Sequence, residues 1–334
     1  MTNGSKFKEV IASSQMIILY IIIGLGICIG LVNNTFFDFA TVITLSRAAL
    51  ITLIFAICEM MIIISGGIDV SFPAIACAAL FIPIEVMTEL GIDSLAFAFC
   101  FAILIGVAFG TINAVLISLI KIPPLIATLG MSSIINGGLL AIFGATENSR
   151  LPNSVDAVFR QYLFTYTSPQ GLNYSLTILF IAPVLLAIIV ALMLRYTKLG
   201  RGIYAIGGNQ KAAAIAGFNV KGIQFFVYIF VGGIVGIAAM ISCILNRTAS
   251  PSNLMGSEMM VIAAVVAGGT RITGGHGTII GTVLGVYLIA LIQNNLIMLG
   301  VPTHWQSFIV GILIIAGTSI TSIKAIRASH SLKV

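Results

Sequence analysis

Long apolar runs alternate along the chain with short polar or glycine-rich segments, and this pattern predicts membrane-spanning helices. An α-helix needs about 20 residues to cross a hydrocarbon core of about 30 Å. The apolar residues are continuous within each run instead of recurring at every second position, which excludes an outer-membrane barrel. Ten candidate spans follow: 16–32, 42–64, 72–86, 95–120, 124–143, 175–194, 223–245, 259–267, 279–298 and 305–323.

Two of these spans, 72–86 and 259–267, are short and lie beside glycine-rich interruptions, so we expect them to be broken, tilted or partly crossing. The chain is therefore predicted to be an all-α polytopic membrane protein with about ten transmembrane helices and glycine-broken segments. We expect residues 1–334 to form a single transmembrane domain, with an inner loop at about 195–222 and an outer loop at about 145–173.

Composition supports a bilayer environment. Hydrophobic residues make up 59% of the chain and charged residues only 8%, against about a quarter in soluble domains, and the mean hydropathy is +1.15. So few polar side chains cannot cover a soluble globule, which excludes a soluble enzyme. The five cysteines fall inside apolar runs without a CxxC pair, and we interpret them as packing residues.

The distribution of the 16 Lys and Arg residues predicts the orientation. Basic residues accumulate in cytoplasmic loops. With the N-terminus inside, twelve of the 16 lie on the cytoplasmic side, and only Arg47, Arg150, Arg160 and Arg247 lie outside. The sequence thus predicts that both termini are cytoplasmic. The net charge of +6 follows from this loop bias, and nucleic acid is not an expected partner.

Catalytic and phosphate-binding motifs are missing from the sequence. The three histidines are far apart, and the chain has no HExxH, GxSxG or GxxxxGK[ST] motif. We therefore expect no enzymatic activity, no metal and no cofactor in this chain, with any nucleotide hydrolysis on a partner subunit. Few ionisable groups lie within spans, which argues against ion-coupled transport.

One exception is Glu59, deep in the second span, which precedes a glycine-rich interruption. That interruption contains Ser65, Gly66, Gly67, Asp69 and Ser71, and either Asp69 or Ser71 is placed to cap a helix restarting near Pro73. This interruption is either a tight turn between spans or a helix break at the translocation path or at a partner interface. Glu59 either lines the substrate path or packs between helices.

Other polar residues in the spans are candidates for the path on polarity alone, or for bonds between neighbouring helices: Asn113, Asn136, Asn246, Gln293 and Asn294. A second glycine cluster, Gly268, Gly269, Gly274 and Gly275, predicts a turn around Arg271 and His276. The spacing of Gly277, Gly281 and Gly285 is typical of close helix packing.

The inner loop contains a short predicted helix. Asn209 is a good N-cap, residues 210–216 are mostly strong helix formers, and Gly217 is placed to end the helix. Its small apolar face would suit docking into a groove of another protein and consists of Ala212, Ala213, Ile215 and Ala216. The alternative is a basic loop resting on anionic lipid headgroups.

Four motifs in order resemble the membrane permease subunit of a bacterial ABC importer of the ribose and simple-sugar type. They are SGGIDVS (65–71), KIPPLIATLGM (121–131), YTKLGRGIYAIGGNQKAAAIAGFNV (196–220) and VAGGTRITGGHGTIIGT (266–282). The resemblance implies that the short helix is the coupling helix that contacts the ATPase. The implied coupling residues are Gly200, Arg201, Gly208, Asn209, Ala212, Ala213, Ala216 and Gly217.

The resemblance further implies a multi-pass protein of the bacterial inner membrane that works by alternating access. Its expected partners are a second permease subunit, two ATP-binding subunits and a soluble solute-binding protein. The cargo would be a simple sugar or sugar-like solute. An autoinducer, nucleoside or branched-chain amino acid remains an alternative, and an ATPase-independent secondary carrier is a further one.

Overall fold

The computed structural model describes residues 14–295 and five positions between 305 and 315. Within the described residues, seven helices are long and apolar enough to cross a membrane. They are α2 (Ser14–Val32), α3 (Phe39–Ile64), α4 (Phe72–Leu90), α5 (Leu95–Ala114) continued by the π-turn η2 (Val115–Leu119), α6 (Pro124–Phe143), α8 (Ile181–Tyr196) preceded by the 3-10 turn η3 (Ile178–Phe180), and α11 (Val220–Asn246). The chain folds as a polytopic helical membrane protein.

The described residues also include two shorter apolar helices, α12 (Glu258–Ala267) and α13 (Ile279–Asn295). The brevity of the span predicted at 259–267 is confirmed, whereas the span predicted at 72–86 is not short. Pro83 lies inside α4 without ending it, and the helix continues to Leu90 before the left-handed Gly91. The tenth predicted span, 305–323, lies mostly outside the described residues.

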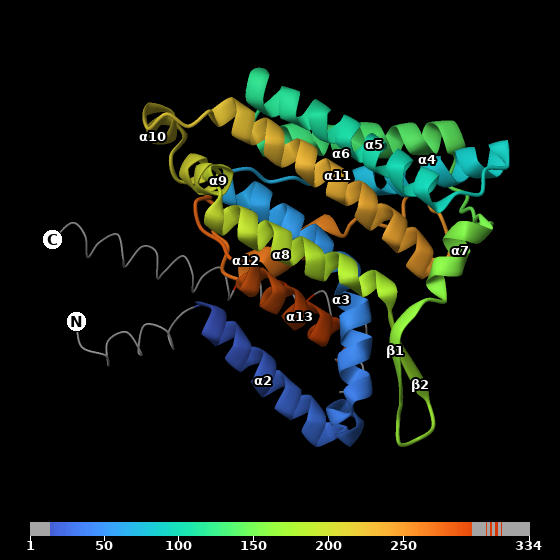
Figure 1. The fold of residues 1–334 in the computed structure, drawn as a ribbon. Coiled ribbons are helices and arrows are strands. Elements are labelled where there is room, and N and C mark those ends of the chain that lie inside the picture. Colours follow the sequence, from blue (N-terminus) through green and yellow to red (C-terminus); the bar gives the residue numbers. More distant parts are fainter. Residues whose placement is uncertain (1–13, 296–304, 306–307, 309–310, 313–314, 316–334) are drawn as a thin grey trace, which may run out of the picture.

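The helices differ in how much of their surface is buried. Most residues of α3, α4 and α11 are buried, whereas α2, α5, α6 and α8 bury only a minor share of theirs. Figure 1 shows α3 in the middle of the array, and it contacts α8, α11, α12 and α13. Apolar helices with so much exposed surface fit contact with lipid or with another membrane subunit.

Glycines set the closest helix crossing, between α5 and α11. A Cβ on Gly106 would collide with the carbonyl oxygen of Gly232, and a Cβ on Gly236 would collide with that of Ala102. The small-xxx-small spacing that brings membrane helices together therefore occurs here. The close packing predicted for the glycines of α13 is also present. Gly281 lies against Gly268, just after α12, and Gly285 lies against Ala264 of α12.

The predicted outer loop is not all helical. It contains α7 (Asn153–Phe159) and an antiparallel hairpin of β1 (Tyr162–Thr167) and β2 (Asn173–Thr177). The prediction that a span begins at residue 175 is therefore wrong, because Ser175 pairs with Thr165 in this hairpin. The all-α prediction holds for the membrane region but fails locally at this loop.

Segments predicted on the same side of the membrane lie together. At the hairpin end, Asn148 pairs with Ala249, and Arg247 forms a 2.7 Å ion pair with Asp156. At the opposite end, α9 (Lys198–Gly208), which is followed by α10 (Gln210–Ile215), lies near the turn before α13 (Figure 1). There the Gln15 side chain donates to the Thr278 hydroxyl at 2.7 Å.

Candidate coupling site and broken helix

Helix α9 connects α8 to the predicted short helix. The Thr197 hydroxyl accepts the backbone N–H of Gly200 at 2.9 Å and caps its start. One face, including Gly200, Ile203 and Ile206, is buried. The sequence does not predict α9, because four glycines lower its intrinsic helix propensity. The helical spacing of Leu199, Ile203 and Ile206 was the available signal.

The predicted short helix is present as α10 and has both predicted caps. The Asn209 side chain accepts the backbone N–H of Ala212 at 3.0 Å. At the other end Gly217 has a φ of +87°, and the N–H of Phe218 donates to the carbonyl of Ala213 at 3.0 Å. The left-handed residue and this returning bond are typical of a helix terminator.

The faces of α10 differ from the prediction in one residue. Ala213 is buried against the rest of the chain, so its predicted place on the docking face is wrong. Ala212, Ile215 and Ala216 are exposed, and Ile215 is 89% exposed. A large apolar side chain this exposed on a two-turn helix is a candidate contact for another protein.

A cavity of about 490 Å³ adjoins this exposed face. It is lined by Ala216 and Gly217 of the α10 end, by Phe218, and by the two cations Lys198 and Arg201. Gly208 is exposed at the junction of α9 and α10, and a Cβ there would meet nothing within 4 Å. The predicted coupling residues therefore gather around α10, with Gly200 and Ala213 buried behind the surface.

Three of the sequence motifs meet backbone to backbone at the C-terminal end of α3. We call this contact the glycine junction: Gly66, Gly207, Gly274 and Gly275. The N–H of Gly275 donates to the carbonyl of Ile64 at 2.9 Å, and a Cβ on Gly207 would collide with that same carbonyl oxygen. Because no side chain fits here, α9 lies directly against the end of α3.

The glycine-rich turn after α12 supplies one side of this junction. Gly274 and Gly275 both have positive φ, and the Tyr204 hydroxyl of α9 donates to the carbonyl of Gly277 at 2.8 Å. Burial and the nearby Arg271 lower the pKa of His276, which favours its neutral form. By contrast, Gly268 lies against Gly281 of α13 and Gly269 turns the chain, so these two do not join the junction.

The interruption between α3 and α4 is a buried, non-helical segment. Glu59 accepts the N–H of Asp69 at 3.2 Å, and one carboxylate oxygen of Asp69 accepts both the N–H and the hydroxyl of Ser71, at 2.7 and 2.6 Å. Asn113 of α5 donates to that hydroxyl at 2.8 Å. The side chain of Ser65 donates to the carbonyl of Ile62 at 2.7 Å, at the end of α3.

Helices α6 and α11 hold the same segment from two further sides. The Thr128 hydroxyl accepts the N–H of Val70 at 3.2 Å, and a Cβ on Gly67 would lie only 2.6 Å from the Tyr228 hydroxyl. Glu59, Asp69, Ser71, Asn113 and Thr128 are all buried. Non-helical backbone at membrane depth is tolerated where the protein encloses it, as here.

The predicted path residues do not form one site. Glu59 and Asn113 bond the broken segment, whereas Asn136 is half-buried on α6. Asn294 lies near the far end of α13, where it lines a separate cavity of about 430 Å³. Asn246 bonds Ser242, and Gln293 bonds Met260. Sequence reasoning missed Thr128 and Tyr228, for which polarity within an apolar span was the available signal.

Comparison with known families decides the class of protein. A family described as the branched-chain amino acid transport system permease component matches residues 13–317. The chain belongs to this permease family. Its resemblance to ABC importer permeases is thereby confirmed, and no solved structure matches the chain.

Curated relatives of the permease include the autoinducer 2 import system permease protein LsrC. The protein from Yersinia enterocolitica serotype O:8 is 32% identical over 304 residues, which cover 89% of this chain and 79% of that protein. Those from Yersinia pseudotuberculosis serotype O:1b and Yersinia pestis strain Pestoides F are each 31% identical, covering 89% of this chain and 81% of theirs.

The permease is thus a non-enzymatic, multi-pass subunit of an ABC importer in the bacterial inner membrane. ATP hydrolysis belongs to a separate subunit, and importers of this family also work with a solute-binding protein.

Proposed function

We propose that this permease imports a small, sugar-like solute, with autoinducer 2 as the first candidate, and that α10 is its coupling helix. The observation that carries the coupling mechanism is the glycine junction, where the loop bearing α10 touches the end of α3 without intervening side chains. The similarity to LsrC permeases supports the choice of cargo.

The ATPase would bind the exposed face of α10. Ile215 supplies an apolar contact on that face, and the adjoining cavity adds the cations Lys198 and Arg201. An apolar anchor beside positive charges fits a groove with acidic residues at its border. ATP would be held by the partner, and this chain would need no cofactor of its own.

Movement would pass from α10 to the membrane helices through α9. Because α9 lies on the carbonyl of Ile64, a displacement of α9 shifts the end of α3 and the segment after it. That segment is bonded to α5 through Asn113 and to α6 through Thr128. Packed helices respond to such a shift by switching between discrete arrangements, as alternating access requires.

The assembly would contain two permeases, two ATP-binding subunits and one solute-binding protein. We infer ten spans with both termini in the cytoplasm, because this orientation places twelve of the 16 basic residues inside. The hairpin and α7 would then lie outside, on the side where the binding protein delivers its cargo.

The cavity of about 430 Å³ at the hairpin end supports an uncharged polar cargo over an amino acid. Its described lining includes hydroxyl, amide and carboxyl groups: Thr35, Asp38, Thr41, Thr44, Gln170, Tyr174, Asn294 and Asn295. Among the described residues, that lining offers the carboxyl of Asp38 to an ammonium group but no Lys or Arg to the carboxylate of an amino acid. Hydroxyl and amide groups suit the hydroxyls of a sugar-like molecule.

Uptake into proteoliposomes tests this proposal. The permease is reconstituted with the ATP-binding subunit and the binding protein encoded beside it, and uptake of labelled autoinducer 2, ribose and leucine is compared with and without ATP. We expect ATP-dependent uptake of autoinducer 2 or ribose. Uptake of leucine alone would overturn the proposed sugar-like cargo. Uptake without ATP would favour a secondary carrier.

A further inference from the structure

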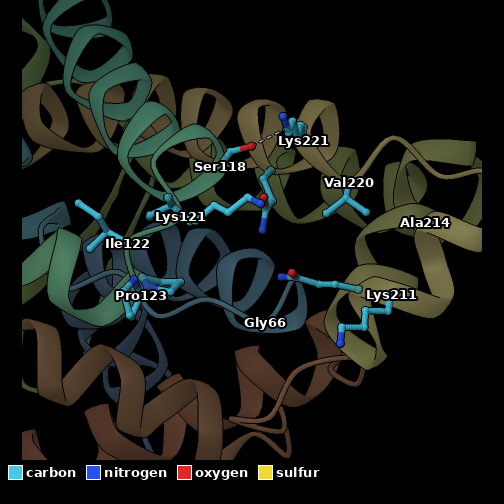
Figure 2. A pocket seen from close by; sticks show the side chains of 13 residues that line it. Gly66, Ser118, Lys121, Ile122, Pro123, Lys211, Ala214, Val220 and Lys221 are labelled. Atoms are coloured by element: carbon cyan, nitrogen blue, oxygen red, sulfur yellow. Dashed lines mark hydrogen bonds between the residues drawn. The ribbon is translucent and has the colours of Figure 1, made fainter.

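A second cavity, of about 470 Å³, lies on another side of α10 and is lined by three lysines from three different elements. Lys121 comes from the turn before α6, Lys211 from α10 and Lys221 from the first turn of α11. Figure 2 shows the three on different sides of the pocket. Gln210 and Gln224 add amide groups to the same lining.

The positive charge of this pocket is uncompensated within the described residues. Its lining contains no Asp or Glu, and no described group forms an ion pair or hydrogen bond with the ammonium of Lys121, Lys211 or Lys221. Lys221 also lies at the positive end of the 27-residue α11. Three like charges around one cavity repel each other, so an anion bound among them would be favoured.

The backbone at Lys121 is unusual. Its φ is +65°, a left-handed conformation that a residue with a Cβ adopts only at a cost. The following Ile122 donates its N–H to the carbonyl of Leu116, which fixes this turn against η2. This hydrogen bond therefore keeps Lys121 in its left-handed conformation beside the pocket.

The surroundings indicate that the anion carries an apolar tail. Leu119 and Ile120, just before Lys121, and Leu125 and Ile126, just after Pro124, are exposed apolar side chains at the ends of two spans. Such residues lie where acyl chains meet headgroups. A soluble anion would need no apolar border, and the exposed Ile215 that we assign to the ATPase does not line this pocket.

We propose that the phosphate of an anionic phospholipid from the inner leaflet binds between Lys121, Lys211 and Lys221. The lipid ties α10 to the α6 turn and to the start of α11, and so holds the coupling helix in place beside the membrane. This inference rests on the proposed cytoplasmic placement of α10, and it requires neither a particular cargo nor the ATPase.

Native mass spectrometry of the purified full-length permease without its ATPase tests the site. The permease is mixed with phosphatidylglycerol or with phosphatidylcholine, and retained lipid is measured for the parent chain, for Lys121→Gln, Lys211→Gln and Lys221→Gln singly, and for the triple variant. Arg195→Gln is the control, because Arg195 is a cation at the end of α8 that stacks on Tyr196 outside the pocket.

We expect preferential retention of phosphatidylglycerol, about fivefold weaker for each lysine removed, with the control unchanged. Competition by inorganic phosphate alone at equal concentration would show that the tail is dispensable and would overturn the lipid assignment. Equal retention of both lipids, or no effect of the single exposed-lysine variants, would overturn it too. Intact lipid retention by the triple variant, together with loss of ATP-binding-subunit capture by that variant in a separate assay, would assign the lysines to a protein partner and overturn the lipid site.

Discussion

Gly207 of α9 lies directly against the carbonyl oxygen of Ile64, the last residue of α3, and that oxygen also accepts a 2.9 Å hydrogen bond from Gly275. One backbone atom thus joins three segments that are far apart in the sequence. The contact is possible because none of the three contributes a side chain at this point. It gives the coupling loop a direct mechanical connection to the broken helix.

Gly207→Ala is expected to break this connection. The added methyl has no free space, so α9 must move away from α3, at a cost of about 1–3 kcal/mol in the free energy of unfolding. Stimulation of ATP hydrolysis by the loaded binding protein should fall with it. Gly137→Ala on α6 is the control, because a Cβ there also meets nothing within 4 Å and the residue lies outside the coupling loop. Equal behaviour of the two variants would contradict the junction.

Asn209→Ala is expected to fray α10 from its start. The variant loses the side-chain acceptor for the N–H of Ala212, and such a cap contributes about 1 kcal/mol. A helix of six residues is only marginally stable, so the loss of the cap should unfold its first turn. Affinity for the ATPase should therefore fall, as measured by titration, while Asn209→Ser should retain most of it. If serine fails to rescue binding, the side chain acts in some way other than capping.

The helices α9 and α10 differ in how well the sequence alone predicts them. The signals for α10 are local, an N-cap at Asn209 and a left-handed glycine at Gly217, and both are visible in the sequence. Helix α9 has weak local signals because of its glycines, and tertiary contact with α3 and α8 stabilises it. The convergence of three glycine motifs depends on that packing, which a single sequence does not encode locally.

The hairpin illustrates a different failure. Residues 162–167 and 173–177 are rich in Tyr, Thr and Phe around a Ser-Pro-Gln-Gly turn, which is typical of paired strands. The apolar run that begins near residue 175 overlaps the second strand and favours a membrane span there, which hides the strand signal. Similarly, the sequence shows Glu59 as a carboxyl group within an apolar span, but its partner, the N–H of Asp69, is visible only in the folded chain.

Glu59→Met is expected to destabilise the permease more than Glu59→Gln. Methionine leaves the buried N–H of Asp69 without an acceptor, which costs about 1–3 kcal/mol, whereas the glutamine carbonyl can still accept it. Thermal unfolding of the two purified variants in the same detergent measures the difference. Similar stability of Met and Gln variants, combined with altered cargo selectivity, would show that Glu59 lines the path instead.

The ion pair of Asp156 and Arg247 should make outer-loop stability depend on pH. The hydrogen bonds from Arg247 lower the pKa of Asp156 below its ordinary value. The pair therefore stabilises the fold above the unfolded-state pKa, and this contribution disappears as the pH falls through the lowered folded-state pKa. Because Arg247 is exposed and Asp156 is partly exposed to solvent, the effect should be modest and weakened by salt.

Melting temperatures of the parent chain and of Asp156→Asn, followed from neutral pH down to about pH 2, check this dependence. The parent should be the more stable at neutral pH, and the difference should vanish at the acid end. Glu147→Gln removes an exposed carboxyl from the same loop as a control. A difference that persists at the acid end would show that the asparagine acts through packing and not through the lost charge.

The central claim is that the exposed face of α10 binds the ATPase, and Ile215→Asp tests it most directly. Immobilised permease captures the purified ATP-binding subunit, and Leu172→Asp places the same charge on an equally apolar, exposed side chain at the hairpin end. We predict that Ile215→Asp abolishes capture while both variants remain folded and inserted. Undiminished capture by Ile215→Asp would contradict the coupling assignment and would place the ATPase contact elsewhere on the permease.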